Sequence, residues 1–272
     1  MTDPGLNIDA LRALRQPNHD TRQIIGRIAN HLGAHDGYLA LSGGKDSLVT
    51  LDLARQADPN LPVVFFDSDL EFPETYDYLD QLQQQWRLNL QIIPASTPLI
   101  NILITDGSWD HNAPDYTTPN LTQALILDPA NQAHEQTGAG EIWGVRAAES
   151  VGRRAAYYTA LAAAAKTCSC SAAQHKTRCG GIITRTNGTI AYGPIWDWSD
   201  NDVWEHIARH QLPLNPVYAK LRRLGVDQRS LRITHLIDAD QLQYGRAVWL
   251  KHGWPDLYER LRAALPRLAE HT

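Results

Sequence analysis

The sequence predicts an α/β fold, in which helices flank a twisted parallel sheet and a helical subdomain follows at the C-terminal end. Three short apolar runs alternate with stretches whose apolar residues recur at helical spacing; the runs cover 38–41, 62–66 and 90–93. This alternation is typical of a parallel sheet, because parallel strands need crossover connections. After residue 195 the patterns are helical only. We therefore expect an α/β domain over 1–195, with a helical subdomain over 196–272 packed on it.

The individual elements follow from apolar periodicity and from turn residues. The pattern predicts helices at 8–33, 47–55, 73–88 and 147–165, a further strand at 141–145, and a hairpin of 182–184 with 189–192. Asn187-Gly188 is a typical hairpin turn between the last two strands. Further helices are expected at 199–210, 217–224, 240–251 and 254–268, with Ser199 as an N-cap. Residues 95–120 carry several turn signals and are expected to form a long loop or lid.

Composition and charge limit the class of protein. The chain has 272 residues, 43% of them hydrophobic, and a formal net charge of −5. These values fit a globular protein and exclude a chain that is basic throughout, although a local basic patch is compatible with them. The first residues lack the apolar core of a signal peptide, and no apolar run approaches the roughly 20 residues of a membrane span. We expect a cytoplasmic protein with no membrane partner.

A glycine-rich loop directly follows the first expected strand; its residues are Ser42, Gly43, Gly44, Lys45, Asp46 and Ser47. Its spacing differs from the Walker loop and from Gly-x-Gly-x-x-Gly. Glycines bring backbone N–H groups close to a ligand, and the N-terminus of the following helix adds partial positive charge. Lys45 adds a full charge and the serines add hydroxyl donors, so the loop is suited to a phosphate group. The alternative is an ordinary strand-to-helix turn that contains glycines.

This loop resembles the SGGxDS pyrophosphate loop of the adenine-nucleotide alpha hydrolase superfamily, the PP-loop ATP pyrophosphatases. Three further segments resemble motifs of one family in it, the phosphoadenosine phosphosulfate (PAPS) reductase family. Residues 65–75 are similar to its DTGxxFPET segment, 144–150 to its GxRxxES signature, and 194–218 to its PIxDWxxxDVWxY…PxNPLY segment. All four occur in the family's order. The resemblance implies a Rossmann-like fold that binds ATP or PAPS.

The resemblance also implies which residues act. The expected catalytic residues are Lys45, Asp46 and Arg146, and the nucleotide-binding set adds Asp67, Gly144 and Glu149 to the loop. Asp67 and Arg146 each follow a strand at the carboxyl edge of the sheet, where such folds bind ligands, and by resemblance Asp67 lies near the adenosine. A guanidinium can donate two parallel hydrogen bonds to a phosphate or sulfate, and Glu149 is expected to orient it. The alternative for Arg146 is a surface ion pair with Glu149, and the segment 197–204 is expected to be structural.

The sequence departs from the family pattern in two places. The family's reductases use a cysteine near the C-terminus, whose thiolate attacks sulfur, whereas no cysteine follows Cys179 here. The glycine of the DTG motif is replaced by Asp69, whose carboxylate would either repel a phosphate or bind Mg²⁺. Reduction by the family's thiol route is therefore not expected of this chain.

These observations lead us to expect an ATP pyrophosphatase or adenylyl-transfer enzyme that activates an acceptor for sulfur transfer. Enzymes of DNA phosphorothioation are the expected closest relatives in kind. The expected partners are an adenine nucleotide with Mg²⁺, a sulfur donor such as a cysteine desulfurase, DNA, and a second copy of the chain in a homo-oligomer. Two alternatives stay open: a PAPS reductase of sulfate assimilation, and a non-catalytic subunit that senses nucleotide.

The chain's three cysteines lie close together in the sequence. Cys168, Cys170 and Cys179 flank His175, and their spacing matches neither the usual zinc finger nor Cys-x-x-Cys. Three interpretations are compatible with this set. One is Zn²⁺ held by three thiolates and an imidazole, one is a 4Fe–4S cluster held by three cysteines, and one is three reduced thiols without metal.

Overall fold

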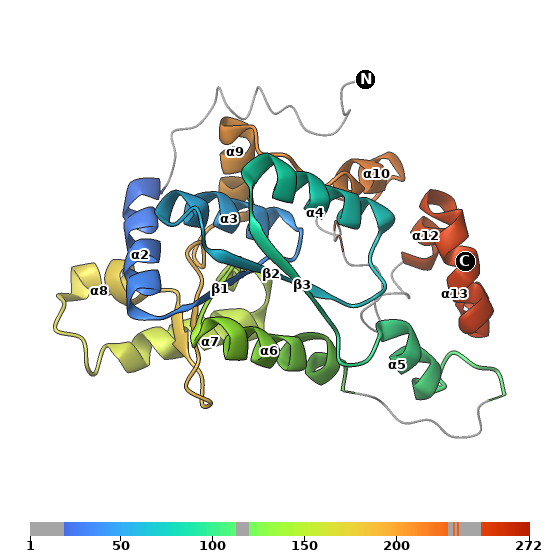
Figure 1. The fold of residues 1–272 in the computed structure, drawn as a ribbon, viewed down its shortest axis with the longest axis horizontal. Coiled ribbons are helices and arrows are strands. Elements are labelled where there is room, and N and C mark those ends of the chain that lie inside the picture. Colours follow the sequence, from blue (N-terminus) through green and yellow to red (C-terminus); the bar gives the residue numbers. More distant parts are fainter. Residues whose placement is uncertain (1–18, 113–119, 228–230, 232, 234–245) are drawn as a thin grey trace. The chain divides into compact units, whose positions relative to one another are not determined.

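The computed structural model describes residues 19–112, 120–227, 231, 233 and 246–272. Its six-stranded sheet has the order β3-β2-β1-β4-β6-β5 (Figure 1). The strands are β1 (Gly37–Ala40), β2 (Pro62–Asp67), β3 (Asn89–Pro94), β4 (Gly140–Trp143), β5 (Ile182–Thr184) and β6 (Ile190–Tyr192). β1 is parallel to both β2 and β4, β4 is parallel to β6, and β5 is antiparallel to β6. The expected α/β class and the C-terminal hairpin of the sheet are confirmed.

Helices connect the strands and follow the sheet. The α-helices are α2 (Thr21–Ala34), α3 (Lys45–Ala57), α4 (Pro73–Trp86), α5 (Leu99–Asp106), α6 (Asp128–Thr137), α7 (Val151–Ala164), α8 (Ala172–Cys179), α9 (Asp200–His210), α10 (Val217–Arg223), α12 (Ala247–Gly253) and α13 (Pro255–Ala264). Short turns of other helix types occur at η1 (Gln123–Leu127), η2 (Ala147–Glu149) and η5 (Pro266–His271). None of the helices in the described ranges is long and apolar enough to cross a membrane.

The central strands are buried on both faces. Leu39 of β1 and Val63 and Val64 of β2 are almost fully buried, as expected for parallel strands that helices cover on either side. α2, α3 and α9 lie on one face of β1 and α7 lies on the other (Figure 1). α3 buries Leu48, Leu51 and neighbouring residues of its first three turns. Burial of this apolar face fixes the helix start, and therefore the loop that precedes it, against the carboxyl end of β1.

The chain forms two compact units. The described residues of the first are 19–65, 82–91 and 133–214, and those of the second are 66–81, 92–112, 120–132, 215–227, 231, 233 and 246–272. The units are described separately below. This division differs from the expected boundary at residue 195, which stays a prediction.

Three local expectations are wrong. The stretch 147–165 is not one helix, because a 3₁₀ turn ends at Glu149 and Ser150 then caps α7 by accepting from the backbone N–H of Arg153. The expected loop 95–120 contains helix α5, whose buried face includes Leu99 and Ile102. α8, which carries the last cysteine, was not predicted either. Three parts of the expected elements lie outside the described residues: 8–18 of the first helix, 113–119 of the expected loop, and 240–245 of the helix expected at 240–251.

Candidate functional site

The glycine-rich loop is held in shape by its own serines. The Ser47 hydroxyl donates to the Gly44 carbonyl (3.0 Å), and its oxygen accepts from the backbone N–H of Ser42 (3.2 Å). Gly43 has a φ of 73°, in the left-handed region that favours glycine. Gly44 is the N-cap of α3. Glycine offers no side chain that could cap the first-turn amides, and a helix N-terminus of this kind suits an anionic ligand.

Gly144, which follows β4, has no room for a side chain. A Cβ atom built on it would lie 2.5 Å from the Ser47 nitrogen and 2.6 Å from the Asp46 carbonyl carbon. Both atoms belong to the backbone of the first turn of α3. Glycine at this position therefore lets the carboxyl end of β4 lie directly against the phosphate-loop helix.

Two cations and two carboxylates meet at the start of α3. Nζ of Lys45 lies 2.6 Å from Oδ2 of Asp46 and 3.0 Å from Oδ1 of Asp200. The guanidinium of Arg146 forms ion pairs with the same two carboxylates: Nε donates to Asp46 and Nη2 lies 3.2 Å from Asp200. Its Nη1 donates to the carbonyl of Trp198 (3.4 Å). Lys45 and Arg146, which are 100 or so residues apart in sequence, are thus brought to one place, as the sequence predicted.

The carboxylate of Asp200 is kept ionised by this arrangement. Burial opposes its ionisation, but the Lys45 ammonium, which also donates a hydrogen bond, and the Arg146 guanidinium together hold its pKa below the usual value. Trp204 Nε1 donates to its other oxygen (3.0 Å). The side chain of Asp200 is 45% exposed, whereas that of Arg146 is 5% exposed. Asp200 is therefore the accessible member of the cluster.

Sequence reasoning missed Asp200, since segment 197–204 was expected to be structural only. The segment does have a structural part: Ser199 caps α9 as predicted, with its hydroxyl accepting from the backbone N–H of Asp202. Asp200, the first residue of α9, points its carboxylate to Lys45 and Arg146 instead. The density of aspartates after Trp198 was the available signal.

Glu149 does not orient the guanidinium of Arg146, and that expectation is wrong. Its carboxylate accepts from the backbone N–H of Arg146 (2.8 Å) and pairs with Arg153 (2.7 Å). The alternative of a surface ion pair is wrong as well, because Arg146 is buried and bonded to Asp46 and Asp200. Glu149 therefore positions the backbone that follows β4, and it does not position the guanidinium of Arg146.

Asp67 and Asp69 belong to the second unit. Oδ1 of Asp67 accepts from the Tyr76 hydroxyl (2.8 Å) and from the backbone N–H of Asp69 (2.9 Å). Asp69 has a φ of 61°, a left-handed conformation that aspartate tolerates better than most residues. The replacement of the family's glycine is therefore compatible with the same backbone turn. Nearby, burial raises the pKa of Glu71, which accepts a hydrogen bond from Ser68, to about 7.

Comparison with known proteins identifies the family. The model of the phosphoadenosine phosphosulfate reductase domain matches residues 37–230, which include the loop, Gly144, Arg146 and Asp200. The chain belongs to this family. The resemblance seen in the four sequence motifs is thereby confirmed, and the chain is an enzyme of a sulfur-related, nucleotide-binding family. The predicted closeness to phosphorothioation enzymes stays a prediction.

Curated relatives and one solved structure agree with this assignment. The phosphoadenosine 5'-phosphosulfate reductase of Xanthomonas oryzae is 27% identical over 191 residues, which cover 68% of this chain and 67% of the relative. That of Xanthomonas campestris is 28% identical over 223 residues, 79% of either chain. The crystal structure of the PAPS reductase from Candida auris has a TM-score of 0.50 at 19% identity, covering 84% of this chain and 95% of that one. This structural likeness supports the fold alone.

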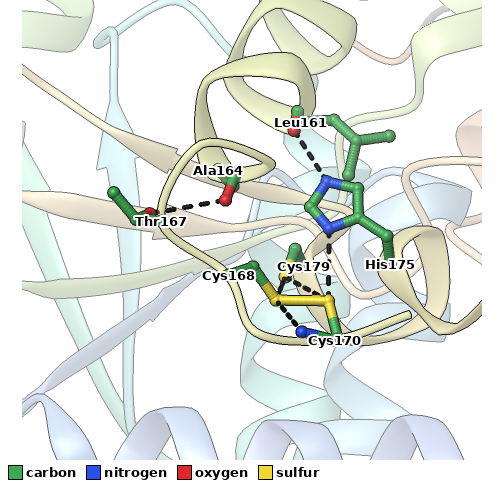
Figure 2. Close-up of a disulfide and its surroundings, with 7 residues drawn as sticks. All are labelled: Leu161, Ala164, Thr167, Cys168, Cys170, His175 and Cys179. Carbon is green, nitrogen blue, oxygen red and sulfur yellow. Dashed lines mark hydrogen bonds between the residues drawn. A yellow bond between two sulfur atoms is a disulfide. The ribbon is translucent and has the colours of Figure 1, made fainter. Parts of the chain in front are cut away.

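This PAPS reductase family member also brings its cysteines and His175 together. The potential ligand atoms of Cys168, Cys170, His175 and Cys179 all lie within 4.8 Å of one another. Cys168 and Cys170 form a disulfide, and Cys179 is a free thiol (Figure 2). The set therefore forms a cluster in space, as its spacing in the sequence suggested.

A second group of possible ligands links two helices of the site. Asp52 of α3 lies with His206 and His210 of α9, their ligand atoms within 4.8 Å of one another. Nε2 of His206 is 2.9 Å from Oδ2 of Asp52, and both residues are buried. This contact joins α3 to α9, the helices whose first residues are Lys45 and Asp200. It therefore helps to keep the Lys45 ammonium and the Asp200 carboxylate next to each other.

Proposed function

We propose that this chain binds an adenine nucleotide with its phosphates over residues 42–47 and catalyses attack of an acceptor on the α-phosphorus. The P–O bond to pyrophosphate breaks, pyrophosphate leaves, and the adenylylated acceptor is ready for sulfur transfer. The observation that carries the proposal is the meeting of Lys45 and Arg146 at an α3 N-terminus capped only by glycine. Two cations beside the N-terminus of a helix suit a group that gains negative charge as it leaves.

The residues of the loop would act by position and charge. Lys45 and the first-turn amides of α3 bind the departing pyrophosphate, because cations and oriented N–H groups stabilise the charge that develops on it. Arg146 is held by Asp46 on one side and by the Trp198 carbonyl on another. A guanidinium fixed in this way offers its remaining donor directions to a phosphate without a further loss of side-chain entropy.

Mg²⁺ fits the donor set of this site. Asp46 and Asp200 offer carboxylate oxygens, the ligands that Mg²⁺ prefers alongside phosphate oxygens. When bound, Mg²⁺ would neutralise part of the phosphate charge during transfer.

We propose DNA of a phosphorothioation pathway as the acceptor, with a sulfur donor such as a cysteine desulfurase supplying the sulfur afterwards. The support is the family membership together with the two cations at the phosphate loop. The function that competes with it is sulfonucleotide reduction, which the names of the curated relatives favour. A chain that only senses nucleotide would bind ATP without releasing pyrophosphate.

Lys45→Ala should lower ATP affinity or pyrophosphate release by tenfold or more. The lost charge-assisted contact is worth roughly 1.5–3 kcal/mol. Binding is measured by calorimetry with ATP and with PAPS, and turnover by pyrophosphate release in the presence of Mg²⁺. Lys166→Ala removes the same charge from an exposed turn position two residues after α7 and should leave both binding and turnover unchanged. Equal binding of both nucleotides by wild type and Lys45→Ala would contradict the proposed phosphate site.

The chain supplied with PAPS and reduced thioredoxin should release no sulfite above background. Reduction needs a thiolate that attacks the sulfate sulfur and is then released by thioredoxin. Reduced thioredoxin can open the disulfide between Cys168 and Cys170, but the restored thiols lie together with Cys179 and His175 in the segment between α7 and β5. Sulfite is measured over time with each single cysteine-to-serine variant in parallel. Steady release that one of these variants abolishes would establish the reductase function instead.

A further inference from the structure

The cysteines and His175 surround one point in space. The sulfur of Cys179 is 3.3 Å from that of Cys168 and 3.9 Å from that of Cys170, and Nδ1 of His175 is 3.3 Å from the Cys170 sulfur. Bonds of about 2.3 Å to sulfur and about 2.0 Å to nitrogen around one tetrahedral zinc ion place neighbouring ligand atoms about 3.5–3.8 Å apart. The observed separations are close to those of a single ion.

The imidazole of His175 is held with its Nδ1 toward the sulfurs. Its other nitrogen, Nε2, lies 2.9 Å from the carbonyl oxygen of Leu161 in α7 (Figure 2). A carbonyl can only accept, so Nε2 carries the proton and Nδ1 has its lone pair free toward Cys170. Histidines that bind zinc are oriented by this same kind of partner on the second nitrogen.

The backbone is arranged around sulfur ligands as well. The N–H of Cys170 donates to the Cys168 sulfur (3.3 Å), and such donors stabilise a thiolate. An iron–sulfur cube, by contrast, distributes its protein ligands over separate irons. Its ligands must therefore stand farther apart than sulfurs that lie within 4.8 Å of one another. The geometry favours a mononuclear site.

The disulfide excludes the metal. Zinc binds thiolates, and the disulfide between Cys168 and Cys170 removes two of them, leaving Cys179 and His175 as ligands. Two ligands do not complete a structural zinc site, which takes four. Zinc binding by all four residues and the disulfide between Cys168 and Cys170 are therefore mutually exclusive.

We propose that the reduced chain binds one Zn²⁺ through Cys168, Cys170, Cys179 and His175, and that oxidation of Cys168 and Cys170 to the disulfide releases it. With hydrogen peroxide as the oxidant, each thiolate gives up one electron and the S–S bond forms. The peroxide O–O bond breaks, and two electrons and two protons yield two molecules of water. A dithiol reductant reverses the step and restores the site. The structure thus describes the oxidised state.

Zinc in this site would order the segment between α7 and β5. Two of its ligands, Cys168 and Cys170, lie between α7 and α8, and His175 and Cys179 belong to α8. The oriented His175 also contacts α7 through the Leu161 carbonyl. α8 is followed by Gly180 and Gly181, which pack so closely on Trp196 that a Cβ on either would come within 3 Å of the indole. The metal would therefore hold α8 in place between α7 and Trp196.

The experiment compares the whole chain in its two redox states. Protein purified without oxygen and with a reductant is analysed for zinc, iron and acid-labile sulfide, and its thiols are counted after denaturation. Peroxide is then added, and released zinc is followed with a chromophoric chelator. We expect one zinc and three thiols per reduced chain, and after oxidation no bound zinc and one thiol, with zinc bound again after reduction and zinc addition.

Two further measurements separate the loss of zinc binding from a loss of folding: variants compared with a matched control, and Co²⁺ added to the unmodified chain. Cys179→Ser and His175→Ala should lower zinc affinity by more than the roughly 10–100-fold that loss of an outer partner costs. His252→Ala, an exposed histidine of α12, is the control and should bind like wild type. In the unmodified chain, Co²⁺ should give the visible bands of a tetrahedral thiolate site. Reduced protein that takes up no zinc, iron with acid-labile sulfide in its place, or zinc that stays bound after oxidation would each overturn the proposal.

Discussion

Replacing Gly144 with alanine should weaken ATP binding and slow pyrophosphate release by about 100-fold, the loss of rate expected when a positioning element moves by about 1 Å. The added Cβ would lie 2.5 Å from the backbone nitrogen of Ser47. No side-chain rotation can relieve a contact between a Cβ and backbone, so the first turn of α3 must shift relative to β4. The amides and Lys45 that face the phosphates shift with it. Overpacking of this kind also lowers the free energy of unfolding by about 1–3 kcal/mol.

Pyrophosphate release, calorimetry with ATP and thermal unfolding measure these effects. Gly152→Ala is the matched control, because nothing lies within 4 Å of a Cβ at that position in α7. Alanine in a helix is favoured over glycine by roughly 0.5–1 kcal/mol, so this control should bind ATP normally and unfold at the same or a slightly higher temperature. ATP binding by Gly144→Ala that matches wild type would show that β4 does not position the loop.

Arg146→Lys should reduce pyrophosphate release by tenfold or more although it keeps the charge. Arg146 uses three nitrogens for three partners, namely Asp46, Asp200 and the Trp198 carbonyl. A single ammonium cannot occupy all three positions, so one carboxylate is left to approach the bound phosphate. Arg146→Ala should in addition lower the free energy of unfolding by roughly 3 kcal/mol. This is the lower end of the cost of removing one partner from a buried ion pair, because Asp200 is partly exposed.

The variants are compared by pyrophosphate release at several ATP concentrations and by denaturant unfolding. Arg153→Lys is the control, because Arg153 makes an exposed ion pair with Glu149 that an ammonium can also form. Lysine at 146 with wild-type kinetics would show that the residue acts as a diffuse charge and that its planar geometry is unimportant.

The loop and its strand could be predicted because local chemistry determines them. Glycines at 43 and 44 after a buried strand allow few conformations, and Ser47 closes the turn with bonds to residues three and five positions away. The α5 helix escaped prediction because turn residues surround its short apolar face. The break before α7 arises from a capping arrangement at Arg146 and Glu149, which helical periodicity does not reveal.

The charge cluster could be predicted only in part. The sequence placed Lys45 and Arg146 at the same edge of the sheet, because each follows a parallel strand. These strands, β1 and β4, pair with each other. The role of Asp200 depends on where α9 begins relative to α3. That placement is set by tertiary contacts such as Asp52 with His206, 154 residues apart, and no local pattern encodes it.

Asp200 gives the site a resident counter-ion. An incoming anion must take the place of a carboxylate that already pairs with Lys45 and Arg146. A halide or a single inorganic phosphate exchanges one partner for another and gains little. A nucleotide with several phosphates adds further contacts to the same exchange, and so would displace the carboxylate with a net gain. The carboxylate that balances the charges of Lys45 and Arg146 therefore also disfavours the binding of small anions.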